Sequence, residues 1–199
     1  MKFAHIADVH LGTRRETPYL YDGFLNFIDY MELHPVDMIF ITGDLFDHVP
    51  TKEDIMFVDT QLARLPKTDI LYVTGECDYL ARDSVLWNYE FVSRTYLLNC
   101  EDIHNHVPDG ERAERNSYAE GIADSLHFAK YNVDVYGICQ YSAQNERNDF
   151  DSVSPAAEGQ PTQCIPFCIR IMPAPLSAIS SSPIVISFVT FIRKTSFFL

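Results

Sequence analysis

Apolar positions in the first half of the chain form short continuous runs that alternate with stretches of helical periodicity. Continuous apolar runs of about four to eight residues are typical of strands buried on both faces of a parallel sheet. Three such runs occur, at residues 2–7, 38–42 and 70–74. Between them, apolar residues recur every three or four positions, which predicts one helix from about residue 20 to Pro35 and another from Thr51 to Pro66. The order of these elements predicts an α/β fold with a parallel sheet.

The apolar runs become shorter from Thr95 onward. Four further strand candidates lie at residues 95–98, 118–122, 126–130 and 133–137. Their close spacing leaves no room for a helix between most neighbours, so the pattern favours a meandering sheet over one built from helical crossovers. The chain is therefore expected to contain a second kind of sheet after the first one.

The last quarter of the chain has a different pattern. No acidic residue follows Glu158, five prolines lie between Pro161 and Pro183, and three serines follow one another at residues 180–182. Prolines at this density prevent regular helices and central strands. We therefore predict a domain at residues 1–150 and an irregular tail at residues 151–199, of the kind that a frame change or a premature end of the coding sequence would produce.

Composition limits the classes of function. A chain of 199 residues that is 47% hydrophobic and 22% charged is expected to form one globular domain. Its net charge of −13 argues against unaided binding to nucleic acid or to an anionic membrane, because clustered Lys and Arg make phosphate contacts. The longest apolar run of the tail, Ile184–Ile192, is far below the roughly 20 residues of a membrane span. With five cysteines in no paired CxxC array and no secretory leader after Met1, we expect a cytoplasmic protein with free thiols and no membrane association.

Side chains that can bind metals follow each of the first three strands. They are Asp8 and His10, then Asp44, then Glu76 and Asp78. Because parallel strands share a carboxyl end, these side chains are expected to be neighbours at one edge of the sheet. Carboxylates gathered there raise one another's pKa unless a cation offsets them, so the pattern favours a pair of hard divalent ions. Two ions about 3.5–4 Å apart can bind a phosphate ester and activate water.

Each of these signals has an ordinary structural explanation when it is taken alone. Asp44 after a glycine is typical of a turn, and so is the composition of residues 75–78. The ordered combination, with each motif after an apolar strand, is what indicates a site. Among the other histidines, which are expected at the surface or in packing roles, only the pair His104 and His106 has a spacing of interest.

Residues 8–12 (DVHLG) and 43–47 (GDLFD) resemble the calcineurin-like metallophosphoesterases, and most closely the SbcD-type DNA repair exonucleases, over about residues 1–140. The resemblance implies a four-layer αββα sandwich, of which this chain would form an incomplete version. It also implies hydrolysis of DNA or another phosphodiester with two divalent metals, expected to be Mn²⁺, and an SMC-like ATPase as partner. In that family, Asp8 and His10 would bind the first metal and Asp44 would bridge both. Asp47 would support the site, and Asp78 would match the last residue of a G-N-H-D motif.

The third motif departs from the family pattern. Glu76 stands in place of the asparagine ligand, and Cys77 stands in place of the histidine that would assist the leaving group. A thiol does not donate a proton as an imidazolium does, and losing such a group typically costs about 10² to 10⁴ in rate. No histidine follows His127, so the later histidine motifs of the family are absent from this sequence.

These departures leave two hypotheses. In the first, the chain is a truncated phosphoesterase or DNA exonuclease with impaired catalysis, with no assigned catalytic residue and at most one well-formed metal site, whose ligands come from Asp8, His10, Asp44 and Glu76. In the second, it is a non-catalytic remnant or a binding subunit of an SbcCD-like ATPase–nuclease complex. Metal binding together with phosphodiester hydrolysis distinguishes the first hypothesis from the second.

Overall fold

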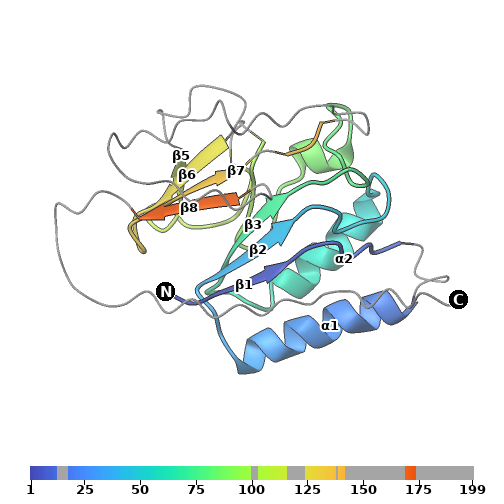
Figure 1. The fold of residues 1–199 in the computed structure, drawn as a ribbon, viewed down its shortest axis with the longest axis horizontal. Helices are drawn as coiled ribbons and strands as arrows, with labels where there is room; N and C mark the ends of the chain where they lie inside the picture. Colours follow the sequence, from blue (N-terminus) through green and yellow to red (C-terminus); the bar gives the residue numbers. More distant parts are fainter. Residues whose placement is uncertain (13–17, 100–102, 116–123, 138, 142–168, 174–199) are drawn as a thin grey trace, which may run out of the picture.

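Four parallel strands form the first sheet, in the order β1-β2-β3-β4 (Figure 1). They are β1 (Phe3–Ile6), β2 (Met38–Thr42), β3 (Asp69–Val73) and β4 (Thr95–Leu97). Nearly every residue of these strands is buried, as expected for a sheet covered on both faces. The computed structural model describes residues 1–12, 18–99, 103–115, 124–137, 139–141 and 169–173. The predicted α/β fold with a parallel sheet is confirmed.

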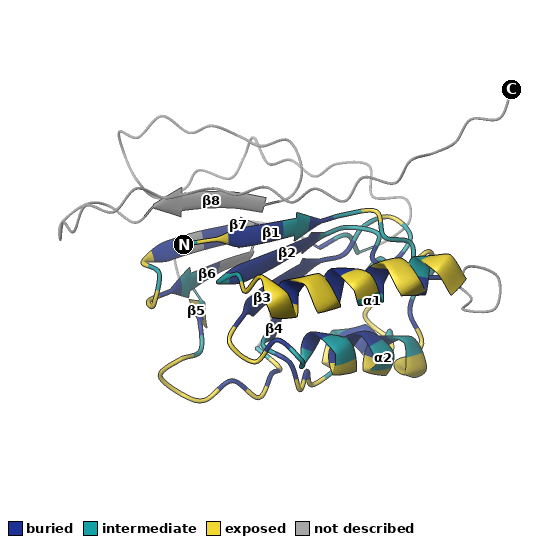
Figure 2. Cartoon of the chain, turned by 90° about the horizontal axis from the view of Figure 1, so that it is seen from below, coloured by how far each residue is buried: buried dark blue, intermediate teal, exposed yellow. Residues whose placement is uncertain are grey.

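Two helices cover one face of this sheet (Figures 1 and 2). The helix α1 (Pro18–Leu33) buries a stripe of apolar residues three or four positions apart, including Phe24, Ile28 and Met31. The helix α2 (Lys52–Leu62) begins after Thr51, whose side-chain oxygen accepts a hydrogen bond from the backbone of Asp54 while the Asp54 carboxylate accepts one from the backbone of Thr51. This reciprocal cap satisfies backbone donors that a helix start would leave unpaired. A short 3₁₀ helix, η1 (Val85–Asn88), follows β3.

The second sheet is antiparallel, in the order β5-β6-β7-β8, and lies on the face of the first sheet opposite α1 and α2 (Figures 1 and 2). Its strands are β5 (Glu114–Arg115), β6 (Asp124–Phe128), β7 (Val133–Gly137) and β8 (Ile169–Pro173). The rings of Tyr96 and Phe128 meet edge to face, with their centroids 5.1 Å apart, and so join the two sheets. The described residues thus provide three layers, helices, sheet and sheet, of the αββα sandwich. The strand candidate at residues 118–122 lies outside the described residues.

The tail contributes a strand, contrary to the sequence prediction for those residues. Within the segment predicted to be irregular, β8 pairs with β7 along its whole length, from Ile169 opposite Gly137 to Pro173 opposite Val133. The strand lies at the end of the sheet order, where proline is tolerated because one side of the backbone needs no partner. The prediction of an irregular tail is therefore wrong for residues 169–173, and the rest of residues 151–199 lies outside the described part.

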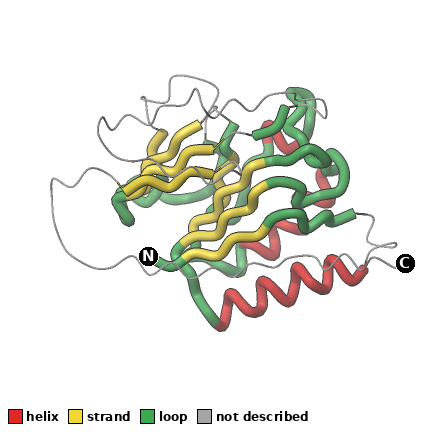
Figure 3. The backbone as a smooth tube through the Cα atoms, in the orientation of Figure 1, coloured by secondary structure: helices red, strands yellow, loops and turns green. Residues whose placement is uncertain are grey.

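The loops after β1, β2 and β3 lie side by side at one end of the first sheet (Figure 3). This arrangement follows from the parallel direction of the strands, which brings their carboxyl ends together. In the part of the chain that the structure describes, no helix is long and apolar enough to cross a membrane.

Candidate metal centre

Backbone hydrogen bonds hold the three loops together beyond the ends of their strands. The amides of Asp8 and His10 donate to the carbonyls of Gly43 (3.2 Å) and Asp44 (2.9 Å), respectively. The amide of Gly43 in turn donates to the carbonyl of Val73 at the end of β3 (2.8 Å). The loop positions are therefore fixed by the sheet and by each other.

Three side chains at this edge come from residues in an unusual backbone conformation. Asp8 and His10 both have a φ of 53°, and Asp44 has a φ of 48°. The left-handed region costs a residue with a Cβ roughly 1–2 kcal/mol, so it persists only where the surrounding structure enforces it. Such strain is concentrated at functional sites, and here it occurs at three of the residues that the sequence marked as metal ligands.

His10, Asp44 and Cys77 form a group of potential metal ligands. Each offers one ligand atom, and these atoms all lie within 4.8 Å of one another. All three residues are partly buried, and the amide of Cys77 donates to Oδ1 of Asp44 (2.8 Å). An imidazole nitrogen, a carboxylate oxygen and a sulfur are a donor set found at divalent transition-metal sites. The residues present therefore fit a metal ion.

The electrostatics of this edge also favour a cation. Burial raises the pKa of the Cys77 thiol, and the negative charges of Asp44, Asp78, Glu76 and Asp47 raise it further. A bound divalent ion would reverse this effect, because it offsets the carboxylates and stabilises the thiolate.

The predicted ligands are only partly brought together. His10 and Asp44 belong to the group, whereas Asp8 and Glu76 do not, and both of these lie exposed at the same edge. Cys77, which the sequence analysis treated only as the replacement of a histidine, belongs to the group instead. The sequence could have indicated Cys77 as a ligand, because cysteine is a common metal ligand and this one follows the end of a strand.

The side chain of Asp78 connects the loop after β2 to the loop after β3 through hydrogen bonds. This side chain is fully buried, and its carboxylate accepts hydrogen bonds from the amides of Leu45 (2.9 Å) and Gly75 (2.6 Å) and from the hydroxyl of Tyr72 (2.5 Å). Weaker contacts reach it from the amides of Asp44 (3.2 Å) and Phe46 (3.4 Å). Burial raises the pKa of Asp78, while these hydrogen bonds act in the opposite direction. Asp78 therefore positions the loops.

His48 joins the second loop to the start of α2. Its Nδ1 lies 2.5 Å from the Asp47 carboxylate, and its Nε2 lies 3.2 Å from the Asp54 carboxylate, which also caps α2. Partial burial alone would lower the pKa of His48, but the hydrogen bonds and charges of Asp47 and Asp54 outweigh burial and raise it. Asp47, the predicted supporting residue, is thus held by an imidazole and is not part of the ligand group.

The raised pKa of His48 predicts a pH dependence of stability. The protonated ring is favoured in the folded state, so its contribution is fully present below the unfolded-state pKa of about 6.5 and is lost as the pH rises through the folded-state value. We expect the difference in free energy of unfolding between wild type and His48→Gln to be larger at about pH 6 than at about pH 8.5, as measured by urea unfolding. An equal difference at both pH values would contradict this role of the ring.

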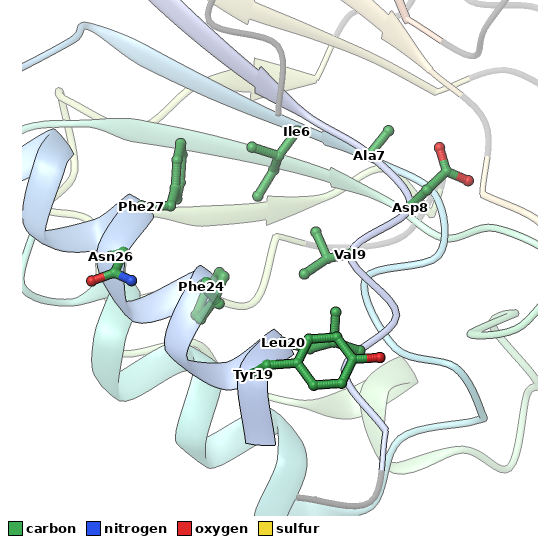
Figure 4. Close-up of a pocket in the computed structure, with 10 residues that line it drawn as sticks. Ile6, Ala7, Asp8, Val9, Tyr19, Leu20, Phe24, Asn26 and Phe27 are labelled. Atoms are coloured by element: carbon green, nitrogen blue, oxygen red, sulfur yellow. The ribbon is translucent and has the colours of Figure 1, made fainter. Parts of the chain in front are cut away.

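A largely apolar pocket of about 300 Å³ lies beside the ligand group, between the end of β1 and the N-terminal half of α1 (Figure 4). Val9, Leu20 and Phe24 contribute to its lining, and the carboxylate of Asp8 lies at its edge and points away from the apolar side chains. His10, Asp44 and Cys77 do not line it, so the pocket is adjacent to the candidate metal centre.

The histidine pair noted in the sequence lies elsewhere. His104 and His106 are both exposed next to Phe91, and His106 approaches the carboxylate of Glu90 at 3.6 Å. Neither histidine is in the ligand group, so the structure assigns them no part in it.

A parallel sheet covered by helices, a second sheet on its other face and a His–Asp–Cys group on the strand-end loops define an α/β protein with a candidate metal centre. The sequence model of the calcineurin-like phosphoesterases matches residues 1–151. The chain therefore belongs to the calcineurin-like phosphoesterase family, a family of metal-dependent phosphoesterases.

Proposed function

We propose that this chain is a divalent-metal-dependent phosphodiesterase of the SbcD type with DNA as its substrate and with impaired catalysis. The observation that carries the proposal is the group formed by His10, Asp44 and Cys77 on three converging loops. Together with the DVHLG and GDLFD motifs, it supports a centre for phosphate esters in a member of this family.

The residues of the chain have distinct roles in this proposal. His10, Asp44 and Cys77 would hold the ion, and Asp78 keeps the second and third loops at a fixed separation through its buried hydrogen bonds. When bound, a divalent ion supplies Lewis-acid chemistry to a phosphoryl oxygen and to the attacking water. Cys77 occupies the position of the family's proton-donating histidine, so departure of the leaving group has no imidazolium to assist it, and the expected loss is about 10² to 10⁴ in rate.

The charge of the chain supports a partner in DNA binding. A net charge of −13 repels the phosphate backbone, so approach to DNA would require the metal and a basic partner subunit. We propose an SMC-like ATPase for this role, and the cytoplasm as the compartment, since Cys77 is a free thiol in the described part of the chain. Mn²⁺ is the ion that the resemblance implies.

A binding subunit without catalysis is the second candidate function. The replacement of the histidine by Cys77 and the exposure of Glu76 favour it, because both changes fall on the motif that the family uses at the metals. In this case the ion would be bound but phosphodiesters would not be hydrolysed.

We expect Asp44→Ala to abolish both metal binding and any hydrolysis, because Asp44 is the carboxylate of the ligand group. The measurements are calorimetric titration of the full chain with Mn²⁺ and hydrolysis of bis(p-nitrophenyl) phosphate and linear double-stranded DNA. Asp22→Ala, which removes an exposed carboxylate of α1, is the matched control and should change neither. Undiminished Mn²⁺ affinity in Asp44→Ala would count against the site, and metal binding without hydrolysis in wild type would select the binding subunit.

A further inference from the structure

Cys77 is held in place by its own backbone. Its amide donates to Oδ1 of Asp44 at 2.8 Å, in a loop that Asp78 anchors through the amide of Gly75 at 2.6 Å. Its sulfur lies within 4.8 Å of the ligand atoms of both His10 and Asp44. The backbone of Cys77 is thus held in place, and its thiol lies next to an imidazole and a carboxylate, as a ligand of the same ion would.

The three atom types select among divalent ions. Mg²⁺ and Mn²⁺ favour oxygen ligands, whereas a thiolate favours Zn²⁺ and comparable transition metals. In catalytic sites, Zn²⁺ is bound by three protein ligands drawn from Cys, His and Asp or Glu, with the fourth tetrahedral position left to water or substrate. His10, Asp44 and Cys77 provide such a set, and the exposed Glu76, the carboxylate that would favour a hard ion, lies outside it.

We infer that Cys77 is a metal ligand and that its thiolate makes this centre select Zn²⁺ over Mn²⁺. The inference rests on the proposed metal site and goes beyond it, because it assigns the ion that the site selects and attributes this choice to the residue that replaces the family's histidine. The centre loses an imidazole at this position and gains a sulfur ligand. Metal choice then follows from this sequence and not from the family pattern.

Co²⁺ is the probe for the sulfur ligand, because thiolate bound to Co²⁺ gives an intense charge-transfer absorption in the near ultraviolet. We expect this absorption when the reduced full chain is titrated with Co²⁺, and we expect Zn²⁺ to displace it. The absorption should persist in the double variant Cys164→Ser/Cys168→Ser, which leaves Cys77 unchanged, and should disappear in Cys77→Ser. The same absorption in Cys77→Ser would overturn the inference.

Affinities provide a second readout. Cys77→Ser should weaken Zn²⁺ binding by at least about 100-fold, since even residues that only orient metal ligands are worth about 10- to 100-fold. Mn²⁺ binding should change far less in the same variant. Equal Zn²⁺ affinity in wild type and in a Cys77→Ser protein with unchanged circular dichroism would contradict the sulfur ligand.

The outcomes distinguish this inference from the proposed function. If His10→Ala and Asp44→Ala lose the metal while Cys77→Ser keeps it, the metal site stands and the sulfur ligand is refuted. If wild type binds Mn²⁺ but neither Co²⁺ nor Zn²⁺, the metal site stands and the selection of Zn²⁺ by the sulfur ligand is refuted. If it binds none of the three ions, both proposals are refuted. Failure to hydrolyse phosphodiesters, with the charge-transfer absorption present, contradicts the proposed phosphodiesterase and supports the sulfur ligand.

Discussion

Replacing Asp78 by alanine should lower the free energy of unfolding by about 3 kcal/mol or more, because several buried donors lose their acceptor at once. The amides of Leu45 and Gly75 and the hydroxyl of Tyr72 all donate to this carboxylate, at 2.9, 2.6 and 2.5 Å. A buried donor left without a partner costs about 1–3 kcal/mol, and the alanine side chain offers none of them an acceptor. Urea unfolding of the full chain measures the effect.

Two further variants serve as comparisons for the loss of unfolding free energy in Asp78→Ala. Asp78→Asn keeps the shape and one acceptor oxygen but places an amide group against backbone donors, so it should also destabilise, by less than alanine does. Asp22→Ala removes an exposed carboxylate and should change the free energy of unfolding by less than about 0.5 kcal/mol. A loss below about 1 kcal/mol in Asp78→Ala would show that water replaces the carboxylate and that Asp78 does not hold the loops together.

Three strands of the first sheet and its two helices could be predicted because their signals are local. The run at residues 95–98 was expected in the meandering sheet, and this expectation is wrong, because β4 pairs parallel to β3 in the first sheet. The apolar runs of β1, β2 and β3 and the helical stripes of α1 and α2 were all recognised from the sequence, with boundaries within a few residues. Parallel direction then follows from the alternation of strand and helix, and the meeting of the loops follows from parallel direction. The meeting of the loops after β1, β2 and β3 could therefore be predicted from the alternation of strands and helices alone.

The second sheet was less predictable because its pairing is non-local. The run at residues 133–137 was recognised as a strand and is β7, whereas β8 was missed, since it pairs with β7 across more than thirty intervening positions. The composition around β8, rich in proline and free of acids after Glu158, favours an irregular segment. A strand at the edge of a sheet depends on its neighbour more than on its own sequence.

The candidate site was predictable in its position but not in its exact members. The sequence gathered Asp8, His10, Asp44 and Glu76, and the structure groups only His10 and Asp44 of these, with Cys77 added. Asp8 lies beyond the end of β1 in the left-handed conformation, and Glu76 and Cys77 lie in the loop after β3, so strand alternation does not describe where these side chains point. Counting positions from a strand end does not fix side-chain directions in the loop that follows.

The close packing of Gly75 against Asp44 predicts a second large effect, for Gly75→Ala. A Cβ on Gly75 would overlap the Oδ1 of Asp44 and lie 2.6 Å from the Asp44 backbone nitrogen. The nitrogen belongs to a loop held by Asp78 and by the sheet, so relief requires the second and third loops to separate. Overpacking of this kind typically costs about 1–3 kcal/mol, and here it acts directly on Asp44, whose carboxylate belongs to the ligand group.

Gly23 provides the matched control, because a Cβ there would meet nothing within 4 Å and the residue lies inside the helix α1. Gly23→Ala should raise the free energy of unfolding by about 0.5–1 kcal/mol, since alanine is the better helix former, and should leave metal affinity unchanged. Gly75→Ala should instead lower the free energy of unfolding and weaken Zn²⁺ binding at least about 10-fold, as expected when residues that position metal ligands are disturbed. The two measurements are urea unfolding and competition with a chromophoric chelator. Wild-type affinity and stability in Gly75→Ala would mean that the two loops can separate freely, and the close approach of Cys77 to Asp44 could then not define a metal centre.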